Sequence, residues 1–443
     1  MTNDTIFAPA TAAGRAGIAV IRISGPAAGQ ALRDLAGLAS PAPRHATRCR
    51  LVDPGSGDTL DDGLALWFPA PASFTGEDVV ELHVHGGRAT VGVVCAALAD
   101  RKEYRIAEPG EFTRRAFDNG KLDLTEVEGL ADLVAAETEA QRKQALRQLD
   151  GALGRHCEGW RDQLLRTLAL IEADIDFPEE GLPEDLATAI KHNIWELEDN
   201  LSQYLDDNRR GERIRDGVFI AILGAPNVGK SSLLNALAQR DAVIVSHTPG
   251  TTRDVVEVHL DLSGYAVTLA DTAGLREAAD HIEQEGIRRA LARAESADLR
   301  LVVFDAAGGG APTAPEWLRP GDLAIFNKMD LAPGAALPGE LGGCHVVSLS
   351  VKEGRNMDVL LATLGDRVAA LVEGEGAAPL TRERHRQALE ECRDGLIRAQ
   401  KAALPELMAE DVRLSARALG RITGRVDVEE VLDVLFREFC IGK

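Results

Sequence analysis

The segment that most constrains the fold of this chain spans residues 218–237, "VFIAILGAPNVGKSSLLNAL". Its first half has the apolar run of a buried strand, and its second half has the pattern of a helix. The turn between them carries Gly224 and, after four intervening residues, Gly229-Lys230-Ser231. Glycines at these positions let backbone N–H groups surround a phosphate at a helix N-terminus, while the lysine and the serine suit the outer phosphates and Mg2+. The segment therefore predicts an α/β domain with a P-loop nucleotide site.

Three further motifs follow the P-loop in order along the chain. "PGTTRD" (249–254) offers a threonine for Mg2+ and the γ-phosphate, and "DTAG" places Asp271 at a strand end, where it would hold the metal through water. "NKMD" runs from Asn327 to Asp330 after the strand-like "LAIF". Asp330 can accept from N1 and the 2-amino group of guanine, and Asn327 can contact the other edge of the base. Adenine lacks this pair of donors, so GTP is expected rather than ATP.

One position differs from an ordinary switch GTPase. Leu275 follows "DTAG", where a glutamine would orient the attacking water. An apolar side chain cannot position water, so another group must act. A monovalent cation near Asn227 can replace an arginine finger electrostatically, and Glu283 or Glu285 can align the water. The residues alone do not choose among these groups.

The sequence on either side of the P-loop segment predicts two other kinds of structure. Residues 6–120 alternate short β-rich runs with helical stretches, which is typical of an α+β domain. Helical patterns occupy 121–216 and resume after 376, so we expect one helical bundle with an α/β domain inserted into it. The predicted domains are 1–120, 121–216, 217–375 and 376–443.

The helical segments show capping signals and apolar stripes. Thr125 and Glu128 are predicted to form a capping box for a helix that continues to about residue 150. Asp427 and Glu430 predict a second capping pair, ahead of Val428, Val431, Leu432, Leu435 and Phe439. Two longer stripes are expected to face the core: Trp160, Leu164, Leu168, Ile171 and Ile175, and then Leu186, Ile190, Ile194, Leu197, Leu201 and Leu205.

Composition and charge indicate which partners and which cellular compartment suit the chain. The net charge is −21, without the basic footprint of a nucleic-acid binder, so RNA contact requires local patches or a partner. The six cysteines lie far apart without a CxxC pair, which favours reduced thiols in the cytosol. No charged-then-apolar leader opens the sequence, and no run of 18 apolar residues occurs in it. Secretion and membrane spanning are therefore both disfavoured. The final "CIGK" fails as a prenylation box because its third residue is Gly and its last is Lys.

With these residues in view, the chain resembles the MnmE (TrmE) family of tRNA-modification GTPases over its whole length. The resemblance is carried by "TIFAPATAAGRAGIAVIRISG", "FTGEDVVELHVHGG", "EPGEFTRRAFDNGKLDLTEVEGLADL", "GAPNVGKSSLLNAL", "GTTRDVVE", "DTAGLRE", "NKMD" and "CIGK". It implies an N-terminal domain that dimerises and binds a tetrahydrofolate, a helical domain in two segments, and an inserted Ras-like α/β P-loop GTPase domain. This is a multidomain fold class with an α+β N-terminal domain and a discontinuous α-helical bundle.

The resemblance also implies an activity. It predicts a cytoplasmic homodimer that hydrolyses GTP with Mg2+ and K+ and does not enter a membrane. With an FAD-dependent partner, MnmG (GidA), the family adds an aminomethyl or carboxymethylaminomethyl group at the 5-position of the wobble uridine of certain tRNAs. The one-carbon unit comes from 5,10-methylene-tetrahydrofolate or a formyl-tetrahydrofolate analogue.

Site residues carry over by position. Asn227, Ser246, Thr248 and Thr251 match the potassium site, and Ser231 and Thr252 match the Mg2+ ligands. Glu283 matches the water-orienting glutamate, in preference to Glu285. Arg22, Glu81, Lys121 and Lys443 match the folate contacts. The complete predicted nucleotide set is Gly224, Asn227, Val228, Gly229, Lys230, Ser231, Ser232, Ser246, His247, Thr248, Pro249, Gly250, Thr251, Thr252, Asp271, Thr272, Ala273, Gly274, Asn327, Lys328, Asp330, Ser348 and Leu349.

The cation loop is "SHTPGTTRD" here, whereas members of the family often have "TDIAGTTRD". Two of the cation contacts in this loop should be backbone carbonyls, although Pro249 restricts its conformation. Cys440 is a catalytic candidate, with a buried structural thiol as the alternative.

Other residues have simpler interpretations. Glu81, His83 and His85 alternate on one strand, and we expect a packed or solvated face there rather than a metal triad. Arg114 and Arg115 are predicted to be ordinary surface charges. The alternative function is a GTP-switched RNA-binding or ribosome-assembly factor without modification chemistry. Such a factor would more often carry a basic or KH-type module with a GXXG loop, and no such module follows residue 376.

Overall fold

The computed structural model describes residues 4–39, 41–176, 184–239, 257–271, 295–308, 314, 318–335, 337–374, 380–426, 429–439 and 442. The chain divides into two compact units. The first contains Met1–Ala131, Gln148–Trp195 and Asp394–Lys443, and the second contains Asp132–Arg147 and Glu196–Arg393. No helix in the described part of the chain is both long and apolar enough to span a membrane.

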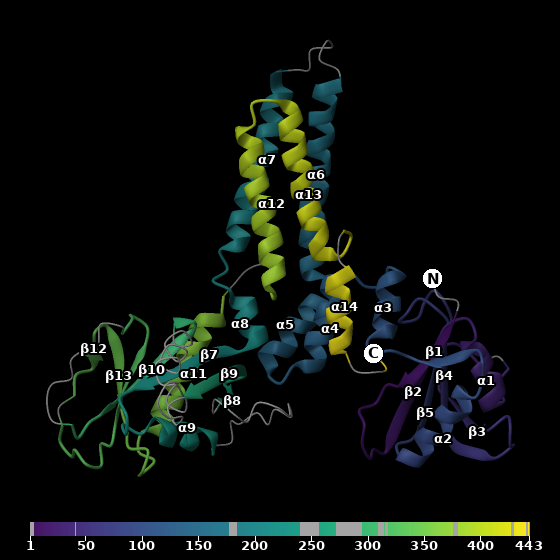
Figure 1. The fold of residues 1–443 in the computed structure, drawn as a ribbon, viewed down its shortest axis with the longest axis horizontal. Helices are drawn as coiled ribbons and strands as arrows, with labels where there is room; N and C mark the ends of the chain where they lie inside the picture. The colour runs from purple at the N-terminus through teal and green to yellow at the C-terminus, as the bar shows by residue number, and fades with distance from the viewer. Residues whose placement is uncertain are drawn as a thin grey trace, which may run out of the picture. The chain divides into compact units, whose positions relative to one another are not determined.

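A six-stranded sheet begins the first unit, with the strand order β3-β4-β5-β2-β1-β6 (Figure 1). Neighbouring strands are antiparallel except for β1 and β6. The strands are β1 Thr5–Pro9, β2 Ile18–Ser24, β3 Thr47–Val52, β4 Thr59–Phe68, β5 Val79–His85 and β6 Tyr104–Ile106. Because successive side chains on a strand point to opposite faces, Ile21 and Ile23 lie on one face of the sheet and Arg22 lies on the other.

The two faces of this sheet have different coverings. Helices α1 (Ala28–Ala36) and α2 (Arg88–Ala99) share a buried core with the face that carries Ile21 and Ile23. Helix α3 (Glu111–Asp118) places Phe112 in a separate buried cluster with Ile6 and Ala8 of β1. Because Ala8 pairs with Arg22 across the two strands, α3 lies over the polar face of the sheet.

The predicted capping box at Thr125 and Glu128 is wrong, because the cap lies two residues earlier. Helix α4 spans Leu124–Ala135. Asp123 Oδ1 accepts a hydrogen bond from the backbone N of Glu126 at 2.9 Å, and Glu126 Oε2 accepts one from the N of Asp123 at 2.7 Å. Thr125 is buried and donates its hydroxyl to Asp123. An aspartate at the N-cap with a glutamate three residues later forms the reciprocal pair.

The single helix expected from Thr125 to about residue 150 is also wrong. Helix α4 ends at Ala135, and a new helix, α5 (Glu139–Leu149), begins after a short break. The backbone N of Thr138 donates to Gln141 Oε1 at 3.1 Å, and the N of Gln141 donates to Thr138 Oγ1 at 3.4 Å. This second reciprocal cap gives the chain a new helix start.

The predicted apolar stripes are largely confirmed. On α6 (Ala152–Asp176), Trp160, Leu164, Leu168 and Ile171 are buried and Ile175 is partly buried. On α7 (Glu184–Leu205), the stripe from Ile190 to Leu205 is buried, while the side chain of Leu186 lies outside the description.

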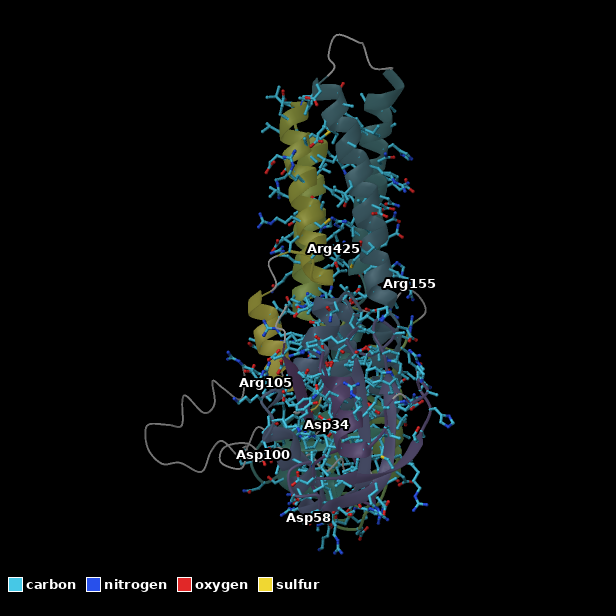
Figure 2. All side chains as sticks on the ribbon, turned by 90° about the vertical axis from the view of Figure 1, so that its right-hand side faces the viewer. Asp34, Asp58, Asp100, Arg105, Arg155 and Arg425 are labelled. Carbon is cyan, nitrogen blue, oxygen red and sulfur yellow. The ribbon has the colours of Figure 1, made fainter. Side chains whose placement is uncertain are left out.

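Helix α6 lies beside α13 (Pro405–Thr423) in the first unit (Figure 1). Arg425, labelled in Figure 2, follows the end of α13. Its guanidinium donates to both carboxylate oxygens of Glu158 on α6, at 2.8 and 2.9 Å. The two helices are therefore joined by an ion pair as well as by their apolar faces.

Helix α14 (Glu429–Glu438) closes the first unit. Leu432, Leu435, Phe436 and Phe439 are buried together with side chains of α4. The predicted cap at Asp427 and the neighbouring Val428 lie outside the described residues.

A seven-stranded sheet dominates the second unit, in the order β12-β13-β11-β10-β7-β9-β8. The strands are β7 Val218–Gly224, β8 Glu257–Leu262, β9 Tyr265–Asp271, β10 Leu299–Asp305, β11 Leu323–Asn327, β12 Glu340–Leu341 and β13 Cys344–Ser348. Among the described helices, α8 Arg210–Asp216, α9 Lys230–Ala238 and α11 Met357–Val372 lie wholly within this unit, while α12 Glu383–Lys401 crosses the unit boundary.

Strand β7 lies between β9 and β10, and it is parallel to both. The direction of strand order reverses at this point, and ligands bind at the carboxyl ends of strands at such a switch point. The P-loop, Asp271 and Asn327 all follow or end strands at this edge. The multidomain fold class is thus confirmed, with an α+β N-terminal part, a discontinuous helical bundle and an inserted α/β P-loop domain.

Candidate nucleotide site and a second polar site

The P-loop connects β7 to α9 in a conformation that requires glycine. Gly229 has a φ of +102°, and a Cβ there would lie 2.3 Å from Nδ2 of Asn327. Asn227 also has a positive φ, of 62°, and its side chain is exposed. Asparagine is among the residues that tolerate this region best. The loop backbone is therefore shaped by close contact with the end of β11.

The charged and hydroxyl groups of the P-loop lie where phosphate and metal chemistry needs them. Lys230 is buried, and its Nζ donates to the carbonyl oxygens of Gly224 at 3.1 Å and Ala225 at 2.8 Å. Ser231 Oγ donates to Oδ2 of Asp271 at 2.6 Å. Hydroxyl and carboxylate oxygens are the donors that Mg2+ prefers, so these two side chains fit the predicted metal position.

The "NKMD" segment is bonded directly to the P-loop. Asn327 Nδ2 donates to the carbonyl of Val228 at 2.9 Å, and Asn327 Oδ1 accepts from the N of Val351 at 3.1 Å. Lys328 Nζ donates to the carbonyl of Asn227 and to Oδ2 of Asp305, both at 2.7 Å. The residues predicted to contact the guanine base and those predicted to contact the phosphates therefore belong to one connected site.

Asp330, the predicted guanine acceptor, is oriented by a serine that the sequence analysis missed. Ser350 Oγ donates to Oδ1 of Asp330 at 2.7 Å, and this hydrogen bond holds the pKa of Asp330 below its usual value. The predicted residues Ser348 and Leu349 immediately precede it, and Leu349 is fully buried. A hydroxyl residue just after the "CHVVS" strand was the available signal.

Several predicted site residues lie outside the described residues. The P-loop set is described, including exposed Ser232 and buried Val228. The residues outside the description are Ser246, His247, Thr248, Pro249, Gly250, Thr251, Thr252, Thr272, Ala273, Gly274, Glu283, Cys440 and Lys443.

A second polar site lies on the face of the N-terminal sheet that α3 covers. Arg22 and Glu81 are direct cross-strand partners, and Arg22 Nη2 donates to Glu81 Oε1 at 2.9 Å. The Arg22 guanidinium lies 5.4 Å from the ring centre of Phe74 and 5.8 Å from that of Phe112. Both ionic groups keep about a fifth of their side-chain surface exposed, 21% and 19%. A solute can therefore reach a carboxylate, a guanidinium and an aromatic ring at one place.

The remaining predicted N-terminal residues lie at different places. Lys121 is exposed, and its Nζ donates to the carbonyl of Pro71, in the loop that also carries Phe74. His83 Nε2 lies 3.4 Å from Glu81 Oε2. His85 Nδ1 instead contacts Oδ1 of Asp61 at 2.8 Å. Among the described residues, no three His, Cys, Asp or Glu side chains are grouped to hold a metal.

Comparison with known proteins identifies the family. The model of the MnmE helical domain matches residues 124–440, and that of the GTP-binding protein TrmE N-terminus matches residues 5–121. The tRNA modification GTPase MnmE of Parvibaculum lavamentivorans is 58% identical over 444 residues, covering 99% of this chain and 100% of the relative. The chain belongs to the MnmE family.

Another member and one solved structure complete the comparison. The tRNA modification GTPase MnmE of Rhodospirillum rubrum is 55% identical to this MnmE-family chain, and the match covers 100% of each chain. The solved G domain of the T. maritima FeoB iron transporter is 25% identical, covering 35% of this chain and 99% of that one. Its TM-score is 0.25, which supports no argument about shape.

The prediction that Arg115 is a surface charge is wrong for this MnmE-family chain. Arg115 is 6% exposed, and its guanidinium pairs with Asp4 at 2.9 Å, Glu77 at 3.1 Å and Glu111 at 3.1 Å. Buried charges persist when they are paired and hydrogen-bonded. Arg114 is exposed, as expected.

The hydrogen bond from Ser350 leads to a pH-dependent prediction. Ionised Asp330 is the form that accepts from guanine, so GTP binding should weaken as the pH falls through the pKa of Asp330. Ser350→Ala removes the donor and raises that pKa, so the loss should begin at a higher pH than in the wild type. GTP affinity measured from about pH 7 to about pH 4 tests this. The control is Thr363→Ala, a partly buried threonine whose hydroxyl donates to the Val359 carbonyl within α11. If GTP affinity fell over the same pH range in Ser350→Ala as in the wild type, the prediction would be wrong.

Proposed function

We propose that this chain is a GTPase that acts in tRNA modification, as the names of its curated relatives state for them. The product is an aminomethyl or carboxymethylaminomethyl group at the 5-position of the wobble uridine. The chain works in the cytoplasm as a homodimer with an FAD-dependent partner, MnmG. The proposal rests on the full-length family match. It is also supported by the hydrogen bonds that join the "NKMD" segment to the P-loop in one site.

Within this function, the described residues bind and orient GTP. The P-loop backbone surrounds the phosphates, and Lys230 exchanges its carbonyl partners for phosphate oxygens. Ser231, and Asp271 through water, would hold Mg2+, and the ion would supply charge neutralisation. Asp330 accepts from the two guanine donors while Asn327 keeps its position against Val228.

Hydrolysis needs a group that replaces the missing switch glutamine. Glu283 is proposed to orient the attacking water, and K+ is proposed to bind beside Asn227. The exposed side chain of Asn227, on a residue with a positive φ, supports a cation contact near the phosphates. The other proposed potassium contacts are Ser246, Thr248 and Thr251, and Thr252 is proposed to join the Mg2+ shell.

The second polar site is proposed to bind the tetrahydrofolate that supplies the one-carbon unit. Glu81 suits the donor edge of a pterin, Phe74 offers an apolar ring surface, and Arg22 and Lys121 suit carboxylates. Lys443 is proposed to complete the contacts. The motion that accompanies GTP binding and hydrolysis is proposed to pass through the helical bundle to this site.

The test is the modification state of wobble uridines in cells that lack this gene. We expect mass spectrometry of their tRNA to show loss of the 5-substituent, and the wild-type gene to restore it. Glu81→Gln should fail to restore it, although the purified variant should hydrolyse GTP normally. Arg48→Gln, an exposed change on β3, is the matched control. Unchanged wobble uridines in the deletion strain would reject the proposal and favour an assembly factor.

A further inference from the structure

One loop of the N-terminal sheet forms part of the second polar site. This β4–β5 loop, residues 69–78, carries Phe74, whose ring centre lies 5.4 Å from the Arg22 guanidinium. Phe112 of α3 lies 5.8 Å from the same guanidinium. Phe112 is fully buried, whereas Phe74 keeps 37% of its surface exposed. The position of the Phe74 ring therefore depends on what holds the loop.

Buried hydroxyl groups join the loop to the end of β2. Thr75 is fully buried, and its Oγ1 lies 2.7 Å from Oγ of Ser24, the last residue of β2. Ser24 Oγ donates to Oε2 of Glu77 at 2.8 Å. Because a hydroxyl carries a single hydrogen, Thr75 donates to Ser24. The Thr75 carbonyl also accepts from Nδ2 of Asn119 at 2.8 Å. The residue next to Phe74 is thus fixed through its side chain and its backbone.

Arg115 of α3 completes this set of contacts. Its Nη1 donates to Oε2 of Glu77 at 3.1 Å and to the carbonyl of Asp4 at 3.0 Å. Its Nη2 donates to Oε1 of Glu111 at 3.1 Å. Phe112 and Arg115 are neighbours on the surface of α3, at positions i and i+3. Helix α3 therefore places one aromatic ring at the site directly and reaches the other through the loop.

The charge of Arg115 is what keeps the Glu77 carboxylate in place. Only 23% of the Glu77 side chain is exposed, and a largely buried carboxylate without a counter-charge is costly in the folded state. Without Arg115, the loop can lower this cost by moving Glu77 into water. Such a movement would break the hydrogen bond from Ser24 and displace Phe74.

We infer that Arg115 is a positioning residue for the Arg22 site, acting through Glu77, Ser24 and Thr75 on the ring of Phe74. It contacts no ligand itself. Its role in holding the loop concerns this chain alone, whereas the consequence for folate rests on the proposed function. A loose loop would have to be ordered by the ligand, and the lost conformational entropy would weaken binding.

Hydrogen exchange measures the order of the loop without any ligand. The backbone N–H groups of Ala70, Ala72 and Glu77 are hydrogen-bonded within the loop, so they exchange slowly while it is held. In the full-length chain, Arg115→Met should speed exchange in peptides covering 69–78 about tenfold or more, the effect of losing a hydrogen bond between charged groups. Ser24→Ala should act in the same direction. Exchange as slow as in the wild type would overturn the positioning role.

Arg105→Met is the matched control. Arg105, labelled in Figure 2, pairs with Asp4 and Glu111 as Arg115 does, but its described contacts do not include Glu77. Exchange in 69–78 should stay within about twofold of the wild type. If this variant loosened the loop as much as Arg115→Met, the effect would be a general one on α3 and the inference would be wrong. If Arg115→Met speeds exchange in β2 and β5 as well, the sheet itself is opening, and Ser24→Ala decides instead.

Calorimetry with 5-formyl-tetrahydrofolate tests the consequence for binding. Arg115→Met should weaken binding about tenfold, and Arg115→Lys should recover part of the loss because a cation remains beside Glu77. Phe74→Ala should weaken binding at least as much. Adding Arg115→Met to Phe74→Ala should cause little further loss, because Arg115 acts through that ring. A merely structural effect would instead add to that of Phe74→Ala.

The failure of this inference and that of the proposed function are distinguishable. If the wild type binds no folate, the folate part of the proposed function fails, while hydrogen exchange still decides whether Arg115 holds the loop. If the wild type binds folate and the losses from Arg115→Met and Phe74→Ala add, the positioning role is wrong and folate binding stands.

Discussion

Asp330→Asn is expected to weaken GTP binding on the order of a thousandfold and to make xanthosine triphosphate the better ligand. A carboxylate accepts from both N1–H and the 2-amino group of guanine, whereas an amide presents one acceptor and one donor. Xanthine has a 2-oxo group in place of the amine, so it matches the amide. Ser350 Oγ, which donates to Asp330 Oδ1, can donate equally to the oxygen of the amide that replaces this carboxylate, so the side chain should keep its orientation.

Competition between labelled GTP and each unlabelled triphosphate measures this change. Glu353→Gln is the matched control, since Glu353 is an exposed carboxylate near the same loop and pairs with Arg355. It should leave both affinities unaltered. If Asp330→Asn retained its preference for GTP, the base would be recognised by other groups and the assignment of the "NKMD" segment would be wrong.

Glu283→Ala is expected to slow GTP hydrolysis by about a hundredfold or more while changing GTP affinity less than about threefold. The physical reason is that the carboxylate is proposed to act on the attacking water and not on the nucleotide. Leu275 occupies the position where a glutamine would otherwise do this. Single-turnover rates and equilibrium binding, measured in the same potassium buffer, separate the two effects.

Glu285→Ala provides the internal control for this experiment, because it removes an equal charge two residues away. It should change turnover only slightly. A larger defect in Glu285→Ala than in Glu283→Ala would exchange their roles. A loss confined to GTP affinity would show that neither carboxylate positions the water.

The sequence predicted the repetitive parts of the fold well and the local exceptions poorly. The apolar stripe from Trp160 to Ile171 was predictable because helical periodicity is a property of neighbouring residues. The P-loop was predictable for the same reason, since its glycines, lysine and serine are close in sequence. The capping box was misplaced because both Asp123 and Thr125 fit the pattern. The tertiary structure decides between them, since it buries Thr125 and pairs Asp123 with Glu126.

Contacts between distant residues explain the other misses. Arg115 is buried by Asp4 and Glu77, which no local pattern connects to it. Ser350 affects Asp330 only because β11 and β13 are neighbours in the sheet. Arg22 and Glu81 were assigned from the family resemblance, and their pairing depends on the register between β2 and β5. Such pairs require the tertiary structure.

The close approach of Gly229 to the amide of Asn327 limits how this site can change during evolution. No side chain fits at position 229 while the amide remains, and the amide is held from two directions by Val228 and Val351. A smaller residue at 327 would make room at 229 but would release both of those backbone partners. Substitutions in the phosphate loop and the base loop are therefore not independent mutational steps. A side chain at position 229 therefore requires a change at position 327 as well.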